Sequence, residues 1–351
     1  METLPEGIQK ILIRSTNWIG DAVMTTPAVR TIRRNYPDAE LTLLAMPWVA
    51  DVFRASPHID RIVAYDKQGR HAGLKGKFVL AGDLRGQGYD AAILLQNAFE
   101  AAFITMLARI PVRAGYTTDG RGLLLTHGVK KARDIKDRHQ VHYYQEMLQG
   151  LGLKPGPDDL ELHIADEDVL WASNSINQYT EGEKRPVIGI NPGAAYGPAK
   201  CWPAEKYAQL AERLCQETDG IVVVFGTNAD RVAAGRIQEA VNNQIRVIDL
   251  TGKTTLGQAL GMISQCSVFV TNDSGLMHVA AALRVPTVAI FGSTDHIATG
   301  PYSDNASIVR TELDCSPCLE THCPRKHFRC MEDIHVDDVA RAVYGHLEKA
   351  A

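Results

Sequence analysis

The sequence predicts an α/β protein made of two doubly wound domains, and three observations support this. The chain has 351 residues, about twice the usual length of one domain. Short β-branched and aliphatic runs alternate with longer amphipathic stretches, which is typical of parallel sheets covered by helices. This alternation starts afresh near residue 187, after an acidic segment punctuated by proline and glycine.

The first series of strands and helices predicts an N-terminal domain over residues 1–180. Its expected strands are 11–13, 41–45, 61–65, 91–95 and 112–115. Stretches of helical periodicity lie between them, at 22–35, 49–55 and 100–109. Residues 67–77 carry several glycines and predict a mobile loop, and residues 166–179 predict a helix that closes the domain.

The second series predicts a C-terminal domain over residues 181–335, joined to the first by a hinge at 181–186. Its expected strands are 187–190, 221–225, 246–250, 268–270 and 287–291, with helices between them. Residues 336–351 form an amphipathic pattern. We expect a C-terminal helix there, which could pack back on the N-terminal domain.

Composition and charge exclude several classes of protein. Hydrophobic residues make up 45% of the chain and charged residues 22%, an ordinary globular composition. The 37 basic and 41 acidic side chains give a net charge of -4, which argues against a general nucleic-acid binder. We find no apolar run of about 18 residues and no signal-peptide core in 1–10, so a cytoplasmic protein is expected.

Ligands of open α/β sheets bind just beyond the carboxyl ends of the strands, and the first such turn spans residues 15–21. Gly20 permits a tight turn, and Asp21 falls at the start of the following helix. The Asp21 carboxylate could accept a proton from a substrate hydroxyl. The alternative is an ordinary carboxylate that stabilises a helix N-terminus. Only one of the three glycines of a dinucleotide fingerprint is present in this turn.

The turn at 191–203 follows the first strand of the second series. Its small residues let a ligand approach the backbone, and Lys200 supplies a charge suited to phosphate. The glycine and lysine spacing does not match a P-loop. The alternative is an ordinary Gly/Pro turn with a solvated lysine.

Two further turns carry candidate binding residues. At 271–278, Asp273 or Ser274 can cap a helix, and Gly275 leaves room for an anion at the N–H groups of the first turn. At 225–230, Gly226 is followed by Asp230, which could bond a ribose. Helix capping alone explains both turns equally well.

The runs 192–203 and 271–283 carry a specific likeness. With Gly20 and Asp21, they resemble the lipopolysaccharide heptosyltransferases of glycosyltransferase family 9, which are inverting GT-B enzymes. The likeness extends from Ile11 to about Leu313 and is strongest to the subgroup that adds the second inner-core heptose. Enzymes that add the first or a later core heptose are the nearest alternatives. A Rossmann-type oxidoreductase or a non-catalytic nucleotide-sugar binding protein is the alternative from a different class.

The resemblance implies ADP-heptose as donor, bound by the C-terminal domain, and heptosyl-Kdo2-lipid A as acceptor, bound by the N-terminal domain. It implies that Asp21 is the general base and that Lys200 contacts the donor diphosphate. The expected donor-binding residues are Asn191, Gly193, Lys200, Gly226, Asp230, Lys253, Thr254, Asp273, Ser274, Gly275, Leu276 and His278. The expected acceptor-binding residues are Asn17, Trp18, Lys75, Lys77, Asn97 and Tyr116. No cofactor is expected to be required for transfer, because fixed protein charge can stabilise the departing diphosphate.

Two basic tracts in the first half suit so anionic an acceptor. The first lies in residues 67–77 and includes Lys75 and Lys77, and the second lies in residues 130–139. Either could contact Kdo carboxylates, lipid phosphates or the inner leaflet, which predicts an enzyme peripheral at the inner membrane. The alternative for each tract is a solvated charged face.

Four of the seven cysteines crowd into one short segment: Cys315, Cys318, Cys323 and Cys330. Their number suits a tetrahedral zinc site, although only one Cys-x-x-Cys pair is present. The sequence therefore predicts a structural zinc clip, remote from transfer, with free or redox-active thiols as the alternative. The resemblance assigns these cysteines no role.

Overall fold

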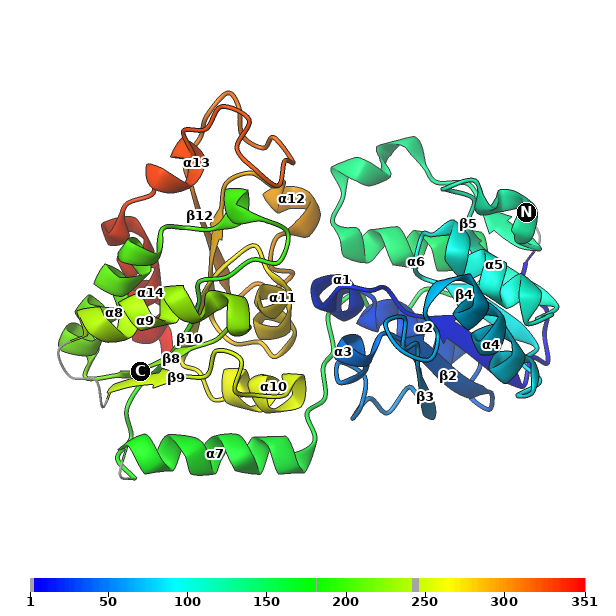
Figure 1. The fold of residues 1–351 in the computed structure, drawn as a ribbon, viewed down its shortest axis with the longest axis horizontal. Coiled ribbons are helices and arrows are strands. Elements are labelled where there is room, and N and C mark those ends of the chain that lie inside the picture. Colours follow the sequence, from blue (N-terminus) through cyan, green and yellow to red (C-terminus); the bar gives the residue numbers. More distant parts are fainter. Residues whose placement is uncertain (1–2, 181, 242–245, 351) are drawn as a thin grey trace. The chain divides into compact units, whose positions relative to one another are not determined.

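The computed structural model describes residues 3–180, 182–241 and 246–350 (Figure 1). It divides into two compact units, Met1–His163 and Ile164–Ala351. Each unit is built on a six-stranded sheet in which neighbouring strands pair in parallel. The predicted α/β class with two doubly wound domains is confirmed.

The sheet of the first unit has the strand order β3-β2-β1-β4-β5-β6. Its strands are β1 (Lys10–Arg14), β2 (Glu40–Ala45), β3 (Arg61–Ala64), β4 (Ala91–Leu94), β5 (Val112–Tyr116) and β6 (His127–Val129). Its helices are α1 (Ile19–Met24), α2 (Thr26–Asn35), α3 (Pro47–Ala50), α4 (Gly73–Arg85), α5 (Phe99–Leu107), η1 (Arg121–Leu124), η2 (Arg133–Asp137) and α6 (Gln140–Gly150). The order reverses between β1 and β4, so a ligand is expected beyond the ends of these two strands.

The prediction of a mobile loop over residues 67–77 is wrong in part, because α4 begins at Gly73. Glycine at position 76 makes this helix start possible. A Cβ on Gly76 would lie 2.0 Å from the backbone carbon of His71, so the preceding turn packs directly on the helix. The helix then packs against α5, and this packing stabilises a helix whose glycines give it a low intrinsic helix propensity.

The sheet of the second unit repeats this arrangement, with the order β12-β11-β10-β7-β8-β9. Its strands are β7 (Val187–Asn191), β8 (Ile221–Val224), β9 (Val247–Asp249), β10 (Val268–Asn272), β11 (Thr287–Phe291) and β12 (Ala306–Arg310). Its helices are α7 (Asp166–Thr180), η3 (Pro198–Lys200), α8 (Ala204–Thr218), η4 (Asn228–Asp230), α9 (Arg231–Ala240), α10 (Leu256–Ser264), α11 (Gly275–Ala282), α12 (His296–Thr299), α13 (Arg329–Glu332) and α14 (Val336–Ala350). The reversal falls between β7 and β10, whose ends carry the two runs that resemble family 9.

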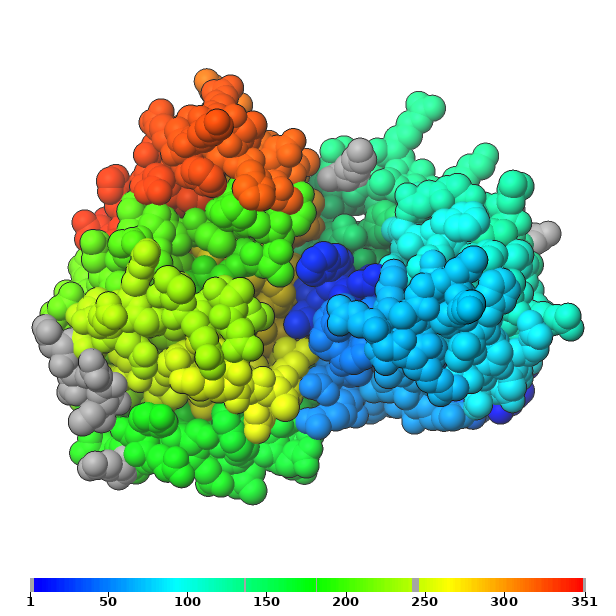
Figure 2. All heavy atoms as spheres, in the orientation of Figure 1, coloured from blue at the N-terminus to red at the C-terminus, as the bar shows by residue number. Residues whose placement is uncertain are grey.

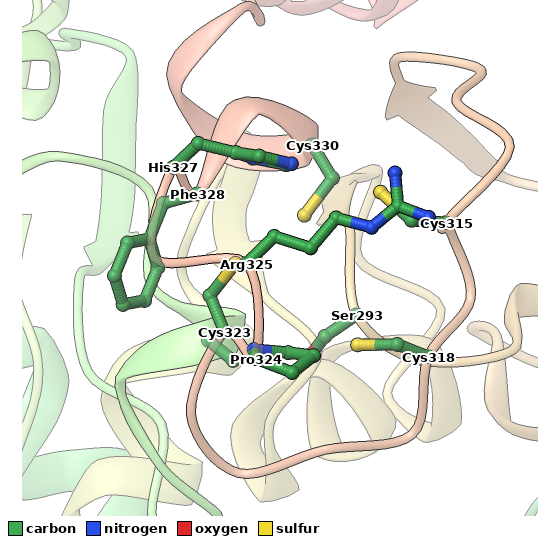
Figure 3. A pocket seen from close by; sticks show the side chains of 10 residues that line it. Ser293, Cys315, Cys318, Cys323, Pro324, Arg325, His327, Phe328 and Cys330 are labelled. Atoms are coloured by element: carbon green, nitrogen blue, oxygen red, sulfur yellow. The ribbon is translucent and has the colours of Figure 1, made fainter.

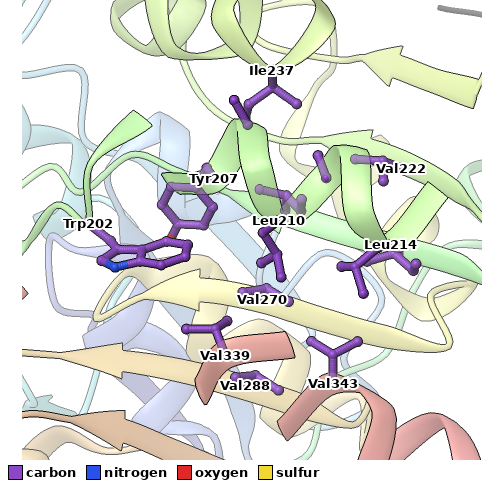
Figure 4. Packing of buried hydrophobic residues seen from close by; sticks show 14 of the residues in the cluster. Trp202, Tyr207, Leu210, Leu214, Val222, Ile237, Val270, Val288, Val339 and Val343 are labelled. Carbon is purple, nitrogen blue, oxygen red and sulfur yellow. The ribbon is translucent and has the colours of Figure 1, made fainter. Parts of the chain in front are cut away.

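The core of the second unit fixes the loop that follows β7. Tyr207, Leu210 and Leu214 recur at helical spacing on α8 and pack with Val270 of β10 and the buried face of α14 (Figure 4). Trp202 packs edge-on against Tyr207, with ring centroids 4.9 Å apart, and its indole N–H donates to the Ile334 carbonyl. The chain is therefore anchored two residues after Lys200.

The predicted domain boundary at 180/181 differs from the division after residue 163. Helix α7 packs against α10, where Gly261 leaves room for the Asp168 carbonyl, 2.3 Å from the position of a Cβ. The helix therefore begins the second unit and does not close the first. Residue 181, in the predicted hinge, lies outside the described residues.

The C-terminal helix α14 packs on α8 and on strands β10, β11 and β12. These elements belong to the second unit, so the helix is part of the core of that unit. Whether it also packs back on the N-terminal domain stays a prediction. Among the helices of the described residues, none is long and apolar enough to cross a bilayer.

Candidate active site

A buried ion pair lies at the carboxyl edge of the second sheet. The Lys200 ammonium is 2.6 Å from Oδ2 of Asp273, and the two side chains are only 13% and 6% exposed. Thr294, which follows β11, donates a second hydrogen bond of 2.7 Å to the same oxygen. The Lys200 Nζ also lies 4.7 Å from the centre of the Tyr196 ring. Lys200 is thus a positioned charge and not a solvated lysine.

The N-terminus of α11 lies beside this pair. The Ser274 hydroxyl caps the helix by accepting from the Met277 N–H at 3.3 Å, and Asn191 donates to the Ser274 hydroxyl at 2.8 Å. Gly275 and Leu276 are half-buried in the first turn, and His278 is buried in the next. The capped helix presents its positive end near Lys200, a favourable place for a phosphate.

Asn272 joins the two loops, and the sequence reasoning missed it. Its amide donates to the Pro192 carbonyl at 2.8 Å and accepts from the Trp202 N–H at 3.0 Å. The Tyr207 hydroxyl donates to the same amide oxygen at 2.9 Å. This residue therefore sets the distance between the loop of Lys200 and the start of α11.

Asp230 is a capping residue in this structure. Its Oδ2 accepts from the N–H and the hydroxyl of Thr227, at 2.7 and 2.9 Å, in a capping box at η4. A Cβ on Gly193 would lie 2.2 Å from Oδ1 of Asp230, and a Cβ on Gly226 would lie 2.8 Å from its Cβ. Glycine at positions 193 and 226 thus lets this carboxylate sit at the same edge as Lys200.

Lys253 and Thr254 lie in the turn between β9 and α10. The Lys253 ammonium is 2.7 Å from Oδ2 of Asp249, so its charge is already compensated. Thr254 is half-buried, and its neighbour Thr255 caps α10. The donor-binding role of both residues stays a prediction.

Asp21 lies in the first turn of α1, at the end of β1 in the first unit. Its residue is half-buried, and α1 packs against α6. Burial, and then the charge of Asp21, raise the pKa of Tyr144 on α6. In the described part of the chain, the nearby hydroxyls of Ser15 and Thr16 are buried without a hydrogen-bond partner. Polar groups able to orient a hydroxyl therefore gather at this turn.

Arg14, at the end of β1, is a second residue that the sequence reasoning missed. Its buried guanidinium donates to Oδ1 of Asn17 at 2.7 Å, and Trp48 donates to the Asn17 carbonyl at 2.9 Å. Burial lowers the pKa of Arg14 to about 10. Asn17 is thus held in place, whereas Trp18 is 59% exposed at the start of α1.

Asn97 and Tyr116 meet at the end of β4 and β5. Asn97 accepts from Arg121 at 2.7 Å and donates to the Tyr143 hydroxyl. Tyr116 is 1% exposed, and its hydroxyl donates to the Tyr143 carbonyl at 2.8 Å. Tyr116 is therefore a buried residue that links the end of β5 to α6.

Lys77 and Lys75 differ in their surroundings. The Lys77 ammonium lies 2.7 Å from Oε2 of Glu100, and Lys67 lies 3.1 Å from the other carboxylate oxygen. Tyr65 donates to that carboxylate at 2.9 Å. Lys75 is exposed on α4. Only Lys75 of the predicted pair presents its charge fully to solvent.

The contacts of Glu100 with Lys77, Lys67 and Tyr65 make the stability of the first unit depend on pH. Burial raises the pKa of Glu100, but hydrogen bonds from Lys77, Lys67 and Tyr65 outweigh that effect and lower the pKa to about 2, from 4.5. A lowered carboxyl pKa stabilises the fold above pH 4.5, and this stabilisation is lost as the pH falls toward about 2. We expect Glu100→Gln to lower the melting temperature at pH 7 and to flatten its fall across this window. Thermal melts from pH 7 to pH 2, with the exposed Glu6→Gln as control, check this, and parallel curves for wild type and Glu100→Gln would contradict it.

The four clustered cysteines are not remote from Lys200. Together with Ala199 and Ser293 they line one cavity of about 20 Å³. Ala199 donates to the Thr321 carbonyl at 3.1 Å, and the Tyr196 hydroxyl donates to the Leu319 carbonyl at 2.9 Å. The prediction of a remote cluster is therefore wrong, because the cysteine segment is bonded to the loop that carries Lys200.

The cysteine thiols lie in a common electrostatic environment. Burial, and then the other three thiols of the cluster, raise the pKa of Cys330 to about 11. Desolvation also raises the pKa of Cys323, but hydrogen bonds from the backbone N–H groups of residues 325–328 outweigh it and lower that pKa. The pKa of Cys330 thus depends on the other three thiols.

Residues 78–329 match the model of glycosyltransferase family 9 (heptosyltransferase). The chain belongs to glycosyltransferase family 9. It is therefore a glycosyltransferase, and this membership excludes the oxidoreductase alternative. The two doubly wound units agree with the GT-B fold of solved heptosyltransferases.

Relatives of this family 9 enzyme share most of its length. It is 35% identical to lipooligosaccharide heptosyltransferase 2 of Haemophilus ducreyi over 311 residues, which cover 86% of the chain and 88% of the relative. It is 32% identical to lipopolysaccharide heptosyltransferase 2 of Escherichia coli, again over 86% of the chain and 88% of the relative. The solved structure of E. coli ADP-heptose LPS heptosyltransferase II superposes with a TM-score of 0.82 at 30% identity, over 97% of this chain and 99% of that one.

Proposed function

We propose that this glycosyltransferase moves heptose from ADP-L-glycero-D-manno-heptose to the first heptose of heptosyl-Kdo2-lipid A, with inversion at the anomeric carbon. The relatives named heptosyltransferase 2, at 32–35% identity, support this acceptor. The observation that carries the donor side is the buried Lys200–Asp273 pair beside the N-terminus of α11. A diphosphate fits this edge because a fixed cation and helix N–H groups meet there.

Transfer breaks the bond between the anomeric carbon and the diphosphate, so negative charge builds on the departing ADP. In this proposal Lys200 and the first N–H groups of α11 stabilise that charge, and each such preorganised donor contributes about 3–4 kcal/mol to the transition state. No metal is needed in this scheme, because protein groups supply the charge. Asp166 and Asp168 form an Asp-x-Asp pair in the first turn of α7, a helix that packs against α10.

Asp21 acts on the acceptor. As the acceptor heptose oxygen attacks the anomeric carbon from the face opposite ADP, its proton passes to the Asp21 carboxylate. The new glycosidic bond forms as the old bond breaks, and ADP leaves with the electron pair. The polar turn at 15–17 and the neighbouring Asn97 orient the acceptor sugar.

We also propose that the first unit contacts the cytoplasmic face of the inner membrane, where the lipid acceptor lies. Leu74 and Phe78 are 63% and 53% exposed on α4, and Phe99 is 50% exposed at the start of α5. Exposed apolar side chains beside Lys75 favour an anionic lipid surface. The proposed site of the enzyme is therefore peripheral to the membrane.

Lys75 tests this surface. We expect Lys75→Gln to raise the KM for heptosyl-Kdo2-lipid A by about fivefold, since one basic residue near an anionic lipid surface contributes about 1 kcal/mol. The KM for ADP-heptose should not change. Steady-state kinetics with both substrates measure this, with the exposed Lys154→Gln as a matched control in the same unit. An unchanged acceptor KM, or an equal rise in the control, would remove the assignment.

The function itself is tested by acceptor choice. The protein is incubated with ADP-heptose and either Kdo2-lipid A or heptosyl-Kdo2-lipid A, and the masses of the products are measured by mass spectrometry. Extension of heptosyl-Kdo2-lipid A alone supports the proposal. Extension of Kdo2-lipid A assigns the enzyme to the first heptose, and the absence of transfer to either acceptor points to a later core heptose.

A further inference from the structure

The four thiols of Cys315, Cys318, Cys323 and Cys330 face a single small cavity. Its volume is about 20 Å³, close to the space that one water molecule occupies. Figure 3 shows the four cysteines around this space on two stretches of chain, with the Arg325 side chain running between them and His327 near Cys330. All four cysteines are free thiols. Four cysteine sulfurs that line one small cavity are candidate ligands for a soft cation.

The backbone around the cavity is unusual for a segment without an apolar core. Leu319, Lys326 and Phe328 all have positive φ, at 61°, 58° and 46°. Each such residue costs about 1–2 kcal/mol, and strain of this kind persists only where the surroundings fix it. The segment lies on the surface of the second unit, in orange in Figure 2, so packing alone holds it weakly.

We propose that these four cysteines bind one divalent metal ion of the zinc class as a tetrahedral tetrathiolate site. Binding replaces four S–H bonds by four metal–sulfur bonds and releases the protons to solvent. Backbone N–H groups of residues 325–328 already point at the Cys323 sulfur, the kind of contact that stabilises a ligating thiolate. Arg325 supplies a cation beside the site, which offsets the negative charge of four thiolates around a divalent ion.

Within the described ranges, no three His, Cys, Asp or Glu side chains stand in an arrangement that holds a metal ion. Ligation therefore requires the four sulfurs, which line one cavity, to move closer together.

A bound metal would fix the position of the loop that carries Lys200, because the cysteine segment is hydrogen-bonded to that loop. Besides the contacts of Ala199 and Tyr196, the Leu319 N–H donates to the Ser293 carbonyl at 2.7 Å. The Ser316 hydroxyl donates to the Gly292 carbonyl at 2.6 Å. Residues 292–294 end in Thr294, which binds Asp273. The closed segment therefore positions both the Lys200 loop and the partner of Asp273, a role that rests on the proposed function.

Metal content tests the site independently of catalysis. The full chain is purified anaerobically under reducing conditions, and its metals are measured by mass spectrometry. We expect about one zinc or iron ion per chain for wild type and for Cys215→Ala, and less than about 0.1 for the double variant Cys318→Ser/Cys323→Ser. Because the double variant can fail to fold, Co2+ is also titrated into chelator-treated wild type, where a tetrathiolate site gives intense visible absorption. Wild type with less than about 0.1 ion per chain and no such absorption would overturn the proposal.

Kinetics test whether a bound metal fixes the loop of Lys200. Removal of the metal by a chelator should raise the KM for ADP-heptose and lower kcat, each by about tenfold, with recovery when Zn2+ returns. The KM for the acceptor should stay constant. A metal-loaded protein that transfers no heptose would refute the proposed function and leave the metal site standing. A metal-free protein with full transfer would do the reverse.

Discussion

Replacing Asp21 by asparagine is expected to reduce kcat for heptose transfer by about 10²–10⁴-fold, the usual contribution of a general base. Asparagine keeps the size and shape of the side chain at the start of α1 but cannot take the acceptor proton. ADP-heptose binding should be unaffected, because the donor edge with Lys200 and Asp273 belongs to the other unit. Steady-state turnover and calorimetric titration with ADP measure the two effects.

Two controls separate catalysis from folding in this experiment. The melting temperature of Asp21→Asn should stay close to that of wild type, since a change at one partly exposed helix carboxylate costs about 1 kcal/mol or less. Asp38→Asn changes an exposed carboxylate of the same unit and should leave turnover intact. Turnover of Asp21→Asn near the wild-type level would show that another group is the base.

Replacing Lys200 by methionine is expected to reduce kcat by about 10²–10³-fold, because the departing diphosphate loses a preorganised cation. The variant carries a second effect. Asp273 is 6% exposed and would be left as an unpaired buried charge, which costs about 3–5 kcal/mol of folding stability. Loss of activity in Lys200→Met alone therefore does not separate the two effects.

The double variant Lys200→Met/Asp273→Asn separates them, since neither charge remains. Its melting temperature should recover toward wild type, while transfer should remain as low as in Lys200→Met. Lys184→Met, an exposed lysine of the same unit, is the control for the loss of a positive charge. Wild-type turnover in the double variant would mean that Lys200 serves only to neutralise Asp273.

The central strands of both sheets could be predicted because they are buried on both faces and read as continuous apolar runs. Strands β7 and β8, for example, are buried throughout. The missed strands are the edge strands β6 and β12, which are short or partly exposed and carry polar residues. The predicted domain boundary at 180/181 differs from the division after residue 163 because the sequence of α7 predicts a helix but not its packing partner, α10.

The site residues could be predicted where they lie close together in the sequence, directly after a predicted strand. Asp273, Ser274 and the loop of Lys200 were found by their place after strands, and the structure brings them together. Thr294 and Arg14 were missed because their partners are fixed by which strands are neighbours, and a single sequence does not state that. A signal existed for Thr294, since it also follows a strand of the second series.

If Lys200 binds the donor diphosphate as proposed, its pairing with Asp273 also affects which anions compete for this edge. Because the two charges cancel at rest, a chloride or a single phosphate must share the ammonium with a carboxylate 2.6 Å away. A diphosphate joined to a nucleoside and a sugar gains contacts on several loops at once and can meet that cost. In the proposed function, a pair that is neutral before binding therefore disfavours small anions relative to the nucleotide-sugar.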